Sequence, residues 1–454
     1  MFINNIPPGI NIKRAYLHIT RLFCVILQPF QYKHLMRRII LISVCLIAVS
    51  GIFAQKKDVT LKFYGQIRTD LYYNSRANEE TVDGLFYMFP KDKVRDNDGN
   101  DINATPNSNF YTLYSRFGVD VTGPDLGKAK TSAKIEGDFR GTSSSFSVVR
   151  LRHAYLNLDW GKSALLLGQT WHPLYGEVSP QILNLSMGAP FQPFSRAPQI
   201  RYRYNNGHLQ LTGAAVWQSQ YTSQGIDPDN NAKSKKSHEY LKKGCIPELY
   251  AGIDYKSGAL LIGAGIEMLS MAPRTQATGA DGSIYKVDER ITTLSYEAHM
   301  KYTSKKWYVA AKSVLGSNLT QASGLGGFGI KKVDIRTGEQ EYTPIRFTGS
   351  WVNAVYGAKW KTGIFVGYAK NLGTSDGLYT DGDGKTQLYG TGTNLGQLLT
   401  TGAELTYNVP HWKFGMEYTL STAWYGSVKP SDGKITDTHG VCNNRMVAVA
   451  MFIF

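Results

Sequence analysis

The sequence predicts an all-β fold, namely a transmembrane antiparallel β-barrel of about sixteen strands whose third loop folds inward. Three observations support this prediction. Apolar and polar residues alternate with a period of two over many segments, which is typical of half-buried strands. These segments run for about ten residues or more, the length that a tilted strand needs to cross a bilayer. Short and long connections alternate along the chain, as they do between the two rims of an outer-membrane barrel.

The composition agrees with this fold class. The 454 residues include 46 glycines and 28 tyrosines, against 19 phenylalanines. Tyrosines collect at the two membrane interfaces of such barrels. Charged residues make up 19% of the chain, below the ~25% that is usual for soluble domains. After the N-terminus, no segment approaches the ~18 consecutive apolar residues of a membrane-spanning helix. A membrane location would therefore require strands.

The first 54 residues are expected to lie outside the barrel. Residues 36–54 have a basic start (MRR), a short apolar run and a small residue at the end, the pattern of a secretory signal peptide. We expect cleavage after Ala54, with Gly51 as the alternative. Residues 1–35 form an upstream extension that is either not translated or not structured. The single barrel then occupies residues 55–454, where 44 basic and 35 acidic side chains leave a net charge of +9, because the six basic residues of the leader are lost and it has no acidic ones.

Two of the four cysteines, Cys245 and Cys442, belong to the barrel. Two are too few for a disulfide-built scaffold. Because they precede the eighth and sixteenth expected strands, on opposite sides of the barrel, we expect both to be unpaired.

The alternation starts at Val59. In the first expected strand the apolar residues share one parity and the polar residues the other: Leu61, Phe63, Ile67, Leu71 and Tyr73 against Lys62, Gln66, Arg68 and Asp70. Segment 149–160 changes parity near His153, which a β-bulge would explain. The last strand, 445–454, is apolar on both parities, so the pattern leaves its orientation open.

The connections divide into two classes by length. Short turns are expected at 122–128, 161–162, 206–207, 256–258, 304–306, 361–363 and 409–411. Long loops are expected at 74–108, 141–145, 172–198, 221–246, 273–289, 317–349, 373–397 and 426–443. An even strand number places both termini on the periplasmic side, and the long loops, including 74–108 and 221–246, outside the cell. The final strand ends on the aromatic residue Phe454. In this it resembles the C-terminal strand that the barrel-assembly machinery of Gram-negative bacteria recognises.

The loop at 172–198 separates LLLGQTW from QIRYRY and has an unusual composition. Its prolines exclude a regular strand or helix. Only Glu177 and Arg196 are ionised within it. A long loop with so little charge is expected to rest on other parts of the protein, so we predict that it folds into the barrel mouth and narrows it. The alternative is a surface excursion with chance apolar content.

The candidate pore-lining residues are basic side chains at lumen parity on the first six strands: Arg68, Arg116, Lys134, Arg140, Arg150, Arg152, Arg201 and Arg203. Together with Glu177 and Arg196 of the loop they form the expected constriction. Rings of Arg or Lys favour the passage of anions. The alternative is that these bases pair with Asp70, Asp120, Glu136 and Asp138 and give a neutral wall. The eight bases outnumber the four acids, which favours a net basic constriction.

Other chemistry has little support in the sequence. No serine occurs in a G-x-S-x-G context, and His153 fits a wall histidine better than a catalytic one. GLGGFG at 324–329 lacks the helix of a phosphate-binding loop, and the Asp-rich segments 96–101 and 381–384 lack the full calcium-loop pattern. The basic residues do not form an exposed stripe with stacking aromatics, which argues against a nucleic-acid partner. We therefore expect no enzyme, metal or cofactor.

Five segments between residues 110 and 205 resemble the DcaP-like outer-membrane porins: SRFGVDV (115–121), KIEGDF (134–139), RLRHAYLNL (150–158), LLLGQTW (165–171) and PQIRYRY (198–204). The resemblance implies a sixteen-stranded trimer with an inward third loop, here 172–198, and a basic constriction that passes small anionic solutes. Some members carry an N-terminal coiled-coil segment that this chain lacks. A trimer through such a segment is therefore not implied, while a trimer through the barrel walls stays open.

The expected function is that of a porin in the outer membrane of a Gram-negative bacterium, embedded in its lipid and passing small polar, anionic solutes by passive diffusion. One alternative is a barrel enzyme that acts on lipids. Another is a closed barrel that only displays surface loops.

Overall fold

The computed structural model describes residues 59–81, 85–141 and 147–454. The expectations for the upstream extension, the signal peptide and its cleavage site lie outside these residues. Of the two units into which the chain divides, the second, Thr60–Phe454, is described below. Among the described residues, no helix is long and apolar enough to cross a membrane.

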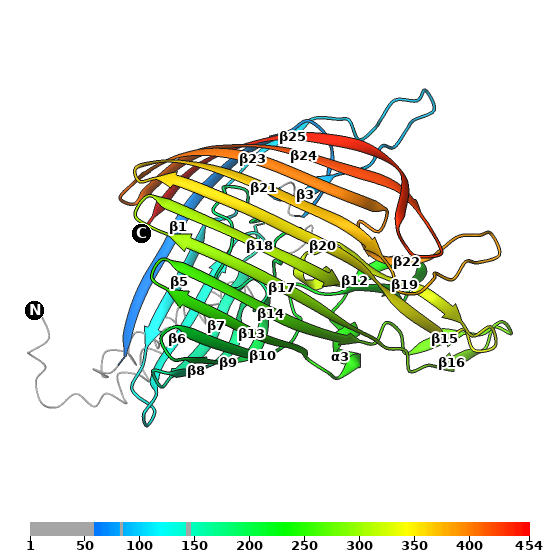
Figure 1. The fold of residues 1–454 in the computed structure, drawn as a ribbon, viewed down its shortest axis with the longest axis horizontal. Helices are drawn as coiled ribbons and strands as arrows, with labels where there is room; N and C mark the ends of the chain where they lie inside the picture. The colour runs from blue at the N-terminus through cyan, green and yellow to red at the C-terminus, as the bar shows by residue number, and fades with distance from the viewer. Residues whose placement is uncertain (1–58, 82–84, 142–146) are drawn as a thin grey trace, which may run out of the picture. The chain divides into compact units, whose positions relative to one another are not determined.

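Sixteen strands of the second unit form a closed antiparallel barrel (Figure 1). They are β1 (Thr60–Asn74), β5 (Arg116–Thr122), β6 (Lys130–Asp138), β7 (Arg150–Asp159), β8 (Ser163–Trp171), β9 (Arg196–Asn205), β10 (Leu209–Val216), β13 (Glu248–Ser257), β14 (Leu260–Met271), β17 (Ile291–Thr303), β18 (Trp307–Ser317), β20 (Gln340–Gly357), β21 (Trp360–Gly373), β23 (Leu395–Val409), β24 (Trp412–Val428) and β25 (Ile435–Ile453). Each pairs with the next, and β1 also pairs with β25, which closes the barrel. The predicted fold class and strand number are confirmed.

The remaining elements belong to the long connections. They are β2 (Asn78–Thr81), β3 (Phe86–Pro90), β4 (Asn107–Tyr111), β11 (Gln224–Asp227), β12 (Asn230–Lys236), α3 (Glu239–Gly244), β15 (Gln276–Thr278), β16 (Ile284–Lys286), η1 (Thr320–Ala322), β19 (Gly326–Val333) and β22 (Leu388–Thr391). β19 pairs with both β20 and β22, so two long loops extend the barrel wall. Of these elements, β15, β16, β19 and β22 lie at the end of the barrel opposite the C-terminus (Figure 1).

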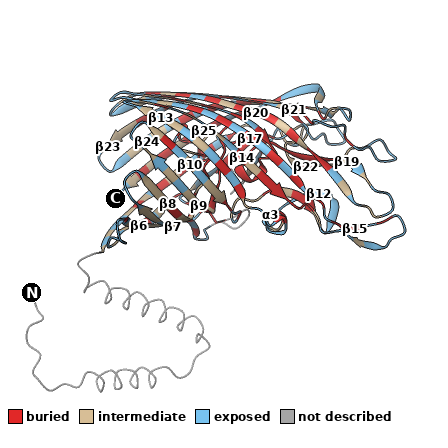
Figure 2. Ribbon diagram, turned by 60° about the horizontal axis from the view of Figure 1, so that its bottom comes forward, coloured by how far each residue is buried: buried red, intermediate tan, exposed pale blue. Residues whose placement is uncertain are grey.

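The predicted alternation corresponds to an inner and an outer face. On β1 the side chains of Phe63 and Ile67 are exposed, whereas Arg68 and Asp70 are buried inside the barrel. Figure 2 shows buried and exposed positions alternating along the strands. Apolar residues that face outward from a barrel are those that contact lipid, so the wall is built to stand in a membrane.

The parity change in β7 is a β-bulge, as predicted. Glu136 of β6 pairs with His153, and the next residue, Gly137, pairs with Leu151, so Arg152 is the extra residue of the bulge. Consecutive residues of a regular strand point to opposite faces. The bulge instead buries Arg152 and His153 together.

The structure corrects three details and settles one. The turn expected at 361–363 falls at 358–359, because Gly357 of β20 pairs with Lys361 of β21. β24 and β25 extend into the loop expected at 426–443, so Cys442 lies within β25 and not before it. Cys442 and Cys245 are both exposed and free. β5 and β10 are shorter than expected, with 7 and 8 residues. In β25, Arg445 is buried inward and Met446 is exposed outward, which settles the strand orientation that the sequence pattern left open.

The two ends of the barrel chain lie at the rim of the short turns. Gly65 and Phe454 exchange two backbone hydrogen bonds of 3.0 and 3.1 Å. With the termini at the periplasmic side, trypsin added to intact cells is expected to cut within 91–95 and 233–236, where exposed Lys and Arg side chains lie in long loops. Mass spectrometry of the fragments tests this topology, with permeabilised cells as the control. Cuts confined to 123–129 or 304–306 in intact cells would contradict it.

Candidate functional site

The third loop, residues 172–195, lies inside the barrel. The side chains of Leu174, Val178, Leu183, Phe191 and Phe194 are at most 2% exposed. The low charge of the loop therefore reflects burial, and the inward fold is confirmed over the surface excursion. The loop is shorter than the predicted 172–198, because Arg196 to Pro198 already belong to β9 and pair with β8.

The loop is fastened to the wall formed by β18 to β24. Lys312 of β18 donates a 2.7 Å hydrogen bond to the carbonyl oxygen of Leu174. Glu417 of β24 accepts a 2.6 Å hydrogen bond from the backbone N–H of Leu183. Trp351 of β20 donates to the side chain of Gln192 at 2.9 Å. Buried backbone groups need such partners, so these side chains fix the path of the loop across the lumen.

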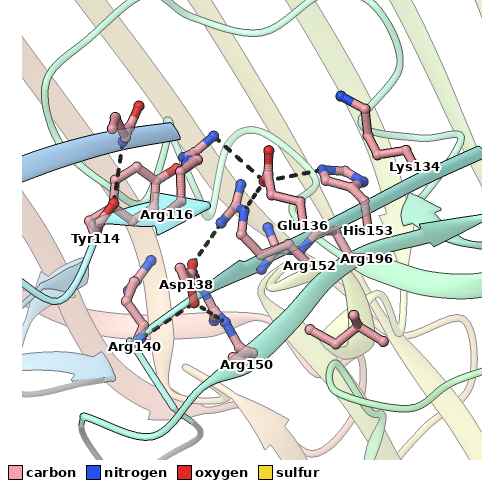
Figure 3. Close-up of polar contacts among 12 residues, drawn as sticks. Tyr114, Arg116, Lys134, Glu136, Asp138, Arg140, Arg150, Arg152, His153 and Arg196 are labelled. Carbon is pink, nitrogen blue, oxygen red and sulfur yellow. Dashed lines mark hydrogen bonds and ion pairs between the residues drawn. The ribbon is translucent and has the colours of Figure 1, made fainter. Parts of the chain in front are cut away.

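A cluster of charged residues lines the wall of β5 to β7 (Figure 3). Arg152 contacts Glu136 at 2.5 Å and Asp138 at 2.9 Å. Arg150 contacts Asp138 at 2.7 Å. All four side chains are buried. These contacts are those of the alternative, in which the arginines pair with acids of the neighbouring strand, and the pore-lining role of the arginines stays a prediction.

Three further bases of the predicted set have carboxylate partners. Arg68 contacts Asp70 at 2.6 Å and also donates to the carbonyl oxygen of Leu183 in the third loop. Arg116 contacts Glu136 at 3.7 Å, and Lys134 contacts Asp120 at 2.9 Å.

Within this cluster, Arg140 and Arg196 differ from the other arginines because neither guanidinium forms an ion pair with a carboxylate among the described residues; only the backbone N–H of Arg140 reaches one, donating a 3.3 Å hydrogen bond to Asp138. They are 1% and 0% exposed, and the Nε and Nη1 atoms of both have no hydrogen-bond partner there. Aromatic rings surround them instead. The Arg196 guanidinium lies 4.7 Å from the ring centroid of Trp171, and that of Arg140 lies 5.6 Å from Phe86. The face of an aromatic ring attracts a cation without neutralising its charge.

Tyr114, in the connection before β5, is the centre of the arginine cluster. The guanidinium carbons of Arg116, Arg68, Arg152 and Arg140 lie 4.5, 5.2, 5.3 and 5.7 Å from its ring centroid. Sequence reasoning missed this residue, since it has no charge and stands outside a strand. An aromatic residue just before a strand with lumen-facing arginines was the available signal.

Arg201, Arg203 and Glu177 form a separate, more open group. Arg203 and Lys256 contact Glu177 at 3.8 and 2.9 Å. Arg201 donates to the Gln199 side chain at 2.8 Å and to the carbonyl oxygen of Trp171. The ten predicted residues are therefore divided. Six arginines gather around Tyr114 and Trp171. Of the other four, Lys134, Glu177 and Arg203 form ion pairs elsewhere, and Arg201 reaches the cluster only through the backbone of Trp171.

A second inward segment was also missed. All five residues of β3, Phe86–Pro90, are buried. Tyr425 of β24 donates a 2.6 Å hydrogen bond to the carbonyl oxygen of Pro90. The prediction placed this segment in the external loop 74–108, where the apolar sequence FYMFP was the signal that part of the loop turns inward.

Comparisons with known proteins agree with this geometry. Residues 50–214 match the family described as DcaP outer membrane protein. The outer membrane channel DcaP of Acinetobacter baumannii is 19% identical, and the match covers 88% of this chain and 99% of that chain with a TM-score of 0.62. OmpT of Vibrio cholerae is 12% identical, with coverage of 88% and 99% and a TM-score of 0.51. No curated protein matches the chain.

At these identities the solved structures establish the fold, and the family match covers the part of the barrel that holds the arginine cluster. The resemblance to the DcaP-like proteins is confirmed over residues 50–214, and the chain is an integral β-barrel of the Gram-negative outer membrane.

Proposed function

We propose that the barrel is a passive channel for small polar solutes with a preference for anions. The observation that carries this proposal is the charge balance of the cluster. Six arginines (Arg68, Arg116, Arg140, Arg150, Arg152 and Arg196) meet three carboxylates (Asp70, Glu136 and Asp138). Pairing therefore leaves a positive excess, with Arg140 and Arg196 as the arginines of the cluster whose guanidinium groups have no carboxylate among the described residues.

The position of this excess supports anion preference. The cluster and the third loop share the lumen, and Arg68 contacts both of them. Salt screens the interactions of exposed charges beyond ~8–10 Å, and it screens buried charges such as these less. Cationic rings in a pore favour anions. The similarity to a protein described as an outer membrane channel supports the channel itself.

Two alternatives make different demands. A lipid-modifying enzyme needs a nucleophile and a base on the outer wall, whereas the hydrogen bond between His153 and Thr170 lies inside the barrel. A closed display barrel would carry no current. The purified protein in a planar bilayer is expected to give discrete conductance steps in KCl, and a correctly folded protein that gives none would exclude the channel.

We further propose that the protein assembles as a homotrimer through the wall of β5 to β9. These strands have 7 to 10 residues, against 14 to 19 in the barrel strands β20, β21, β23, β24 and β25. A seven-residue strand tilted by ~45° spans only ~16 Å, less than the ~25 Å apolar band of an outer-membrane barrel. Because strands this short do not span the apolar band of the membrane, the outer surface of this wall is better buried against neighbouring copies of the chain than against lipid.

Thiol crosslinking tests this interface. In a background with C245S and C442S, I135C on β6 is expected to give covalent dimers with a bifunctional maleimide. The matched control is I364C on β21, since Ile135 and Ile364 are 54% and 58% exposed on the two walls. Crosslinks at position 364 without any at position 135 would contradict the proposed wall, and a native mass of one chain would contradict the trimer.

A further inference from the structure

A groove of about 600 Å³ runs along the outer wall over β25, between β24 and β1. Ala448 and Ala450 of β25 form its floor, and Phe414 and Met416 of β24 form one side. Strand register explains the shape. Phe414 pairs with Ala450 and Met416 with Ala448, so two small side chains stand beside two large ones.

The opposite side of the groove is also apolar. Leu71 of β1 pairs with Ala448 and, on its other side, with Phe110 of β4. Leu71, Phe110 and Met416 are all at least 51% exposed. A groove with apolar sides and an alanine floor on a lipid-facing wall has the shape and the chemistry of a binding site for an acyl chain.

One end of the groove reaches the rim of the short turns. Trp360 and Tyr407 line this end, and the Nζ atom of Lys359 lies 5.0 Å from the ring centroid of Tyr407. The neighbouring turn carries Lys305 and Lys306, and the two turns are joined by the hydrogen bond from Gly357 N–H to the carbonyl oxygen of Lys306.

These three lysines are exposed, and neither turn contains an acidic residue, since the sequences are TSKKW at 303–307 and GAKWK at 357–361. The turns of the opposite wall contain acidic residues. Lys130 contacts Asp125 at 2.6 Å, and Lys162 shares its turn with Asp159. The turns beside the groove therefore carry positive charge with no acidic residue among them, whereas the turns of the opposite wall include Asp125 and Asp159.

We propose that this face is a binding site for an anionic phospholipid, with one acyl chain in the groove over Ala448 and Ala450 and the headgroup phosphate at Lys305, Lys306 and Lys359. Basic side chains at a membrane surface attract anionic headgroups, and the aromatic side chains Trp360 and Tyr407 sit at headgroup level. The rim of the short turns faces the periplasmic leaflet in the expected orientation. The site does not depend on the proposed channel function.

Native mass spectrometry of the full barrel tests the site, with phosphatidylglycerol and phosphatidylethanolamine as the added lipids. The wild type is expected to retain phosphatidylglycerol preferentially. The triple variant K305Q/K306Q/K359Q should lower that retention by about tenfold, given a favourable contribution from each basic side chain. The matched control K128Q/K162Q on the opposite wall should leave it unchanged.

A second variant separates the groove from the charge. A448L/A450L keeps an apolar outer wall and the barrel fold, but it fills the floor, so retention of both lipids should fall. Equal retention of the two lipids by the wild type, or unchanged retention in either site variant, would overturn the proposal. So would a change of oligomer mass in A448L/A450L with lipid retention unaltered, because the groove would then hold a second copy of the chain.

Discussion

Replacing Arg140 and Arg196 with glutamine is expected to lower the ratio of chloride to potassium permeability by about tenfold, which corresponds to about 1.4 kcal/mol of free energy. The guanidinium groups of these two residues have no ion-pair partner among the described residues, so their removal leaves no carboxylate without its cation. Burial of these charges without a carboxylate costs stability in the wild type. The variant should therefore keep its fold and unfold at the same temperature or a higher one.

The matched variant is R150Q/R152Q. It removes the same number of charges but leaves Asp138 and Glu136 buried with fewer partners. Buried carboxylates that lose their cations tend to take up protons, which cancels much of the charge change. We expect a smaller change in selectivity and a stability loss of about 3–5 kcal/mol. Reversal potentials compare the ion selectivity of the two variants, and thermal melts compare their stability. Equal loss of selectivity in the two would refute the special role of Arg140 and Arg196.

Shortening the third loop is expected to raise single-channel conductance several-fold. Replacing residues 178–191 by a short Gly-Ser linker removes side chains that fill the lumen, including Val178, Leu183 and Phe191. The flanking strands β8 and β9 remain paired with each other, so the barrel should still close. Single-channel recording measures the effect.

Two controls accompany this experiment. An equal cut in the exposed loop 374–387, which lies outside the lumen, should leave conductance unchanged. A point variant gives a finer test: E417A removes the acceptor for the N–H of Leu183 and should make the current noisier, whereas E417Q keeps an acceptor oxygen and should not. Unchanged conductance after the loop is shortened would mean that this loop does not limit the pore.

The barrel could be predicted from the sequence because its signals are local. Strands, turns and even the bulge at Arg152 follow from residue parity, which a strand imposes on its own residues. The inward third loop could be predicted from its prolines and its lack of charge. Whether Arg150 faces Asp138 or open lumen depends on register between strands, which parity does not give. The same holds for Tyr114, whose neighbours come from separate strands, and for β3, which reaches its place through a long loop.

The zero-current potential of the wild-type channel in a KCl gradient tests the central claim most directly. An excess of buried arginine over carboxylate beside the third loop should make chloride the more permeant ion. The zero-current potential should therefore have the same sign as the equilibrium potential of chloride. Its magnitude should fall toward zero in R140Q/R196Q. A potential with the sign set by potassium in the wild type would contradict the claim that this lumen prefers anions.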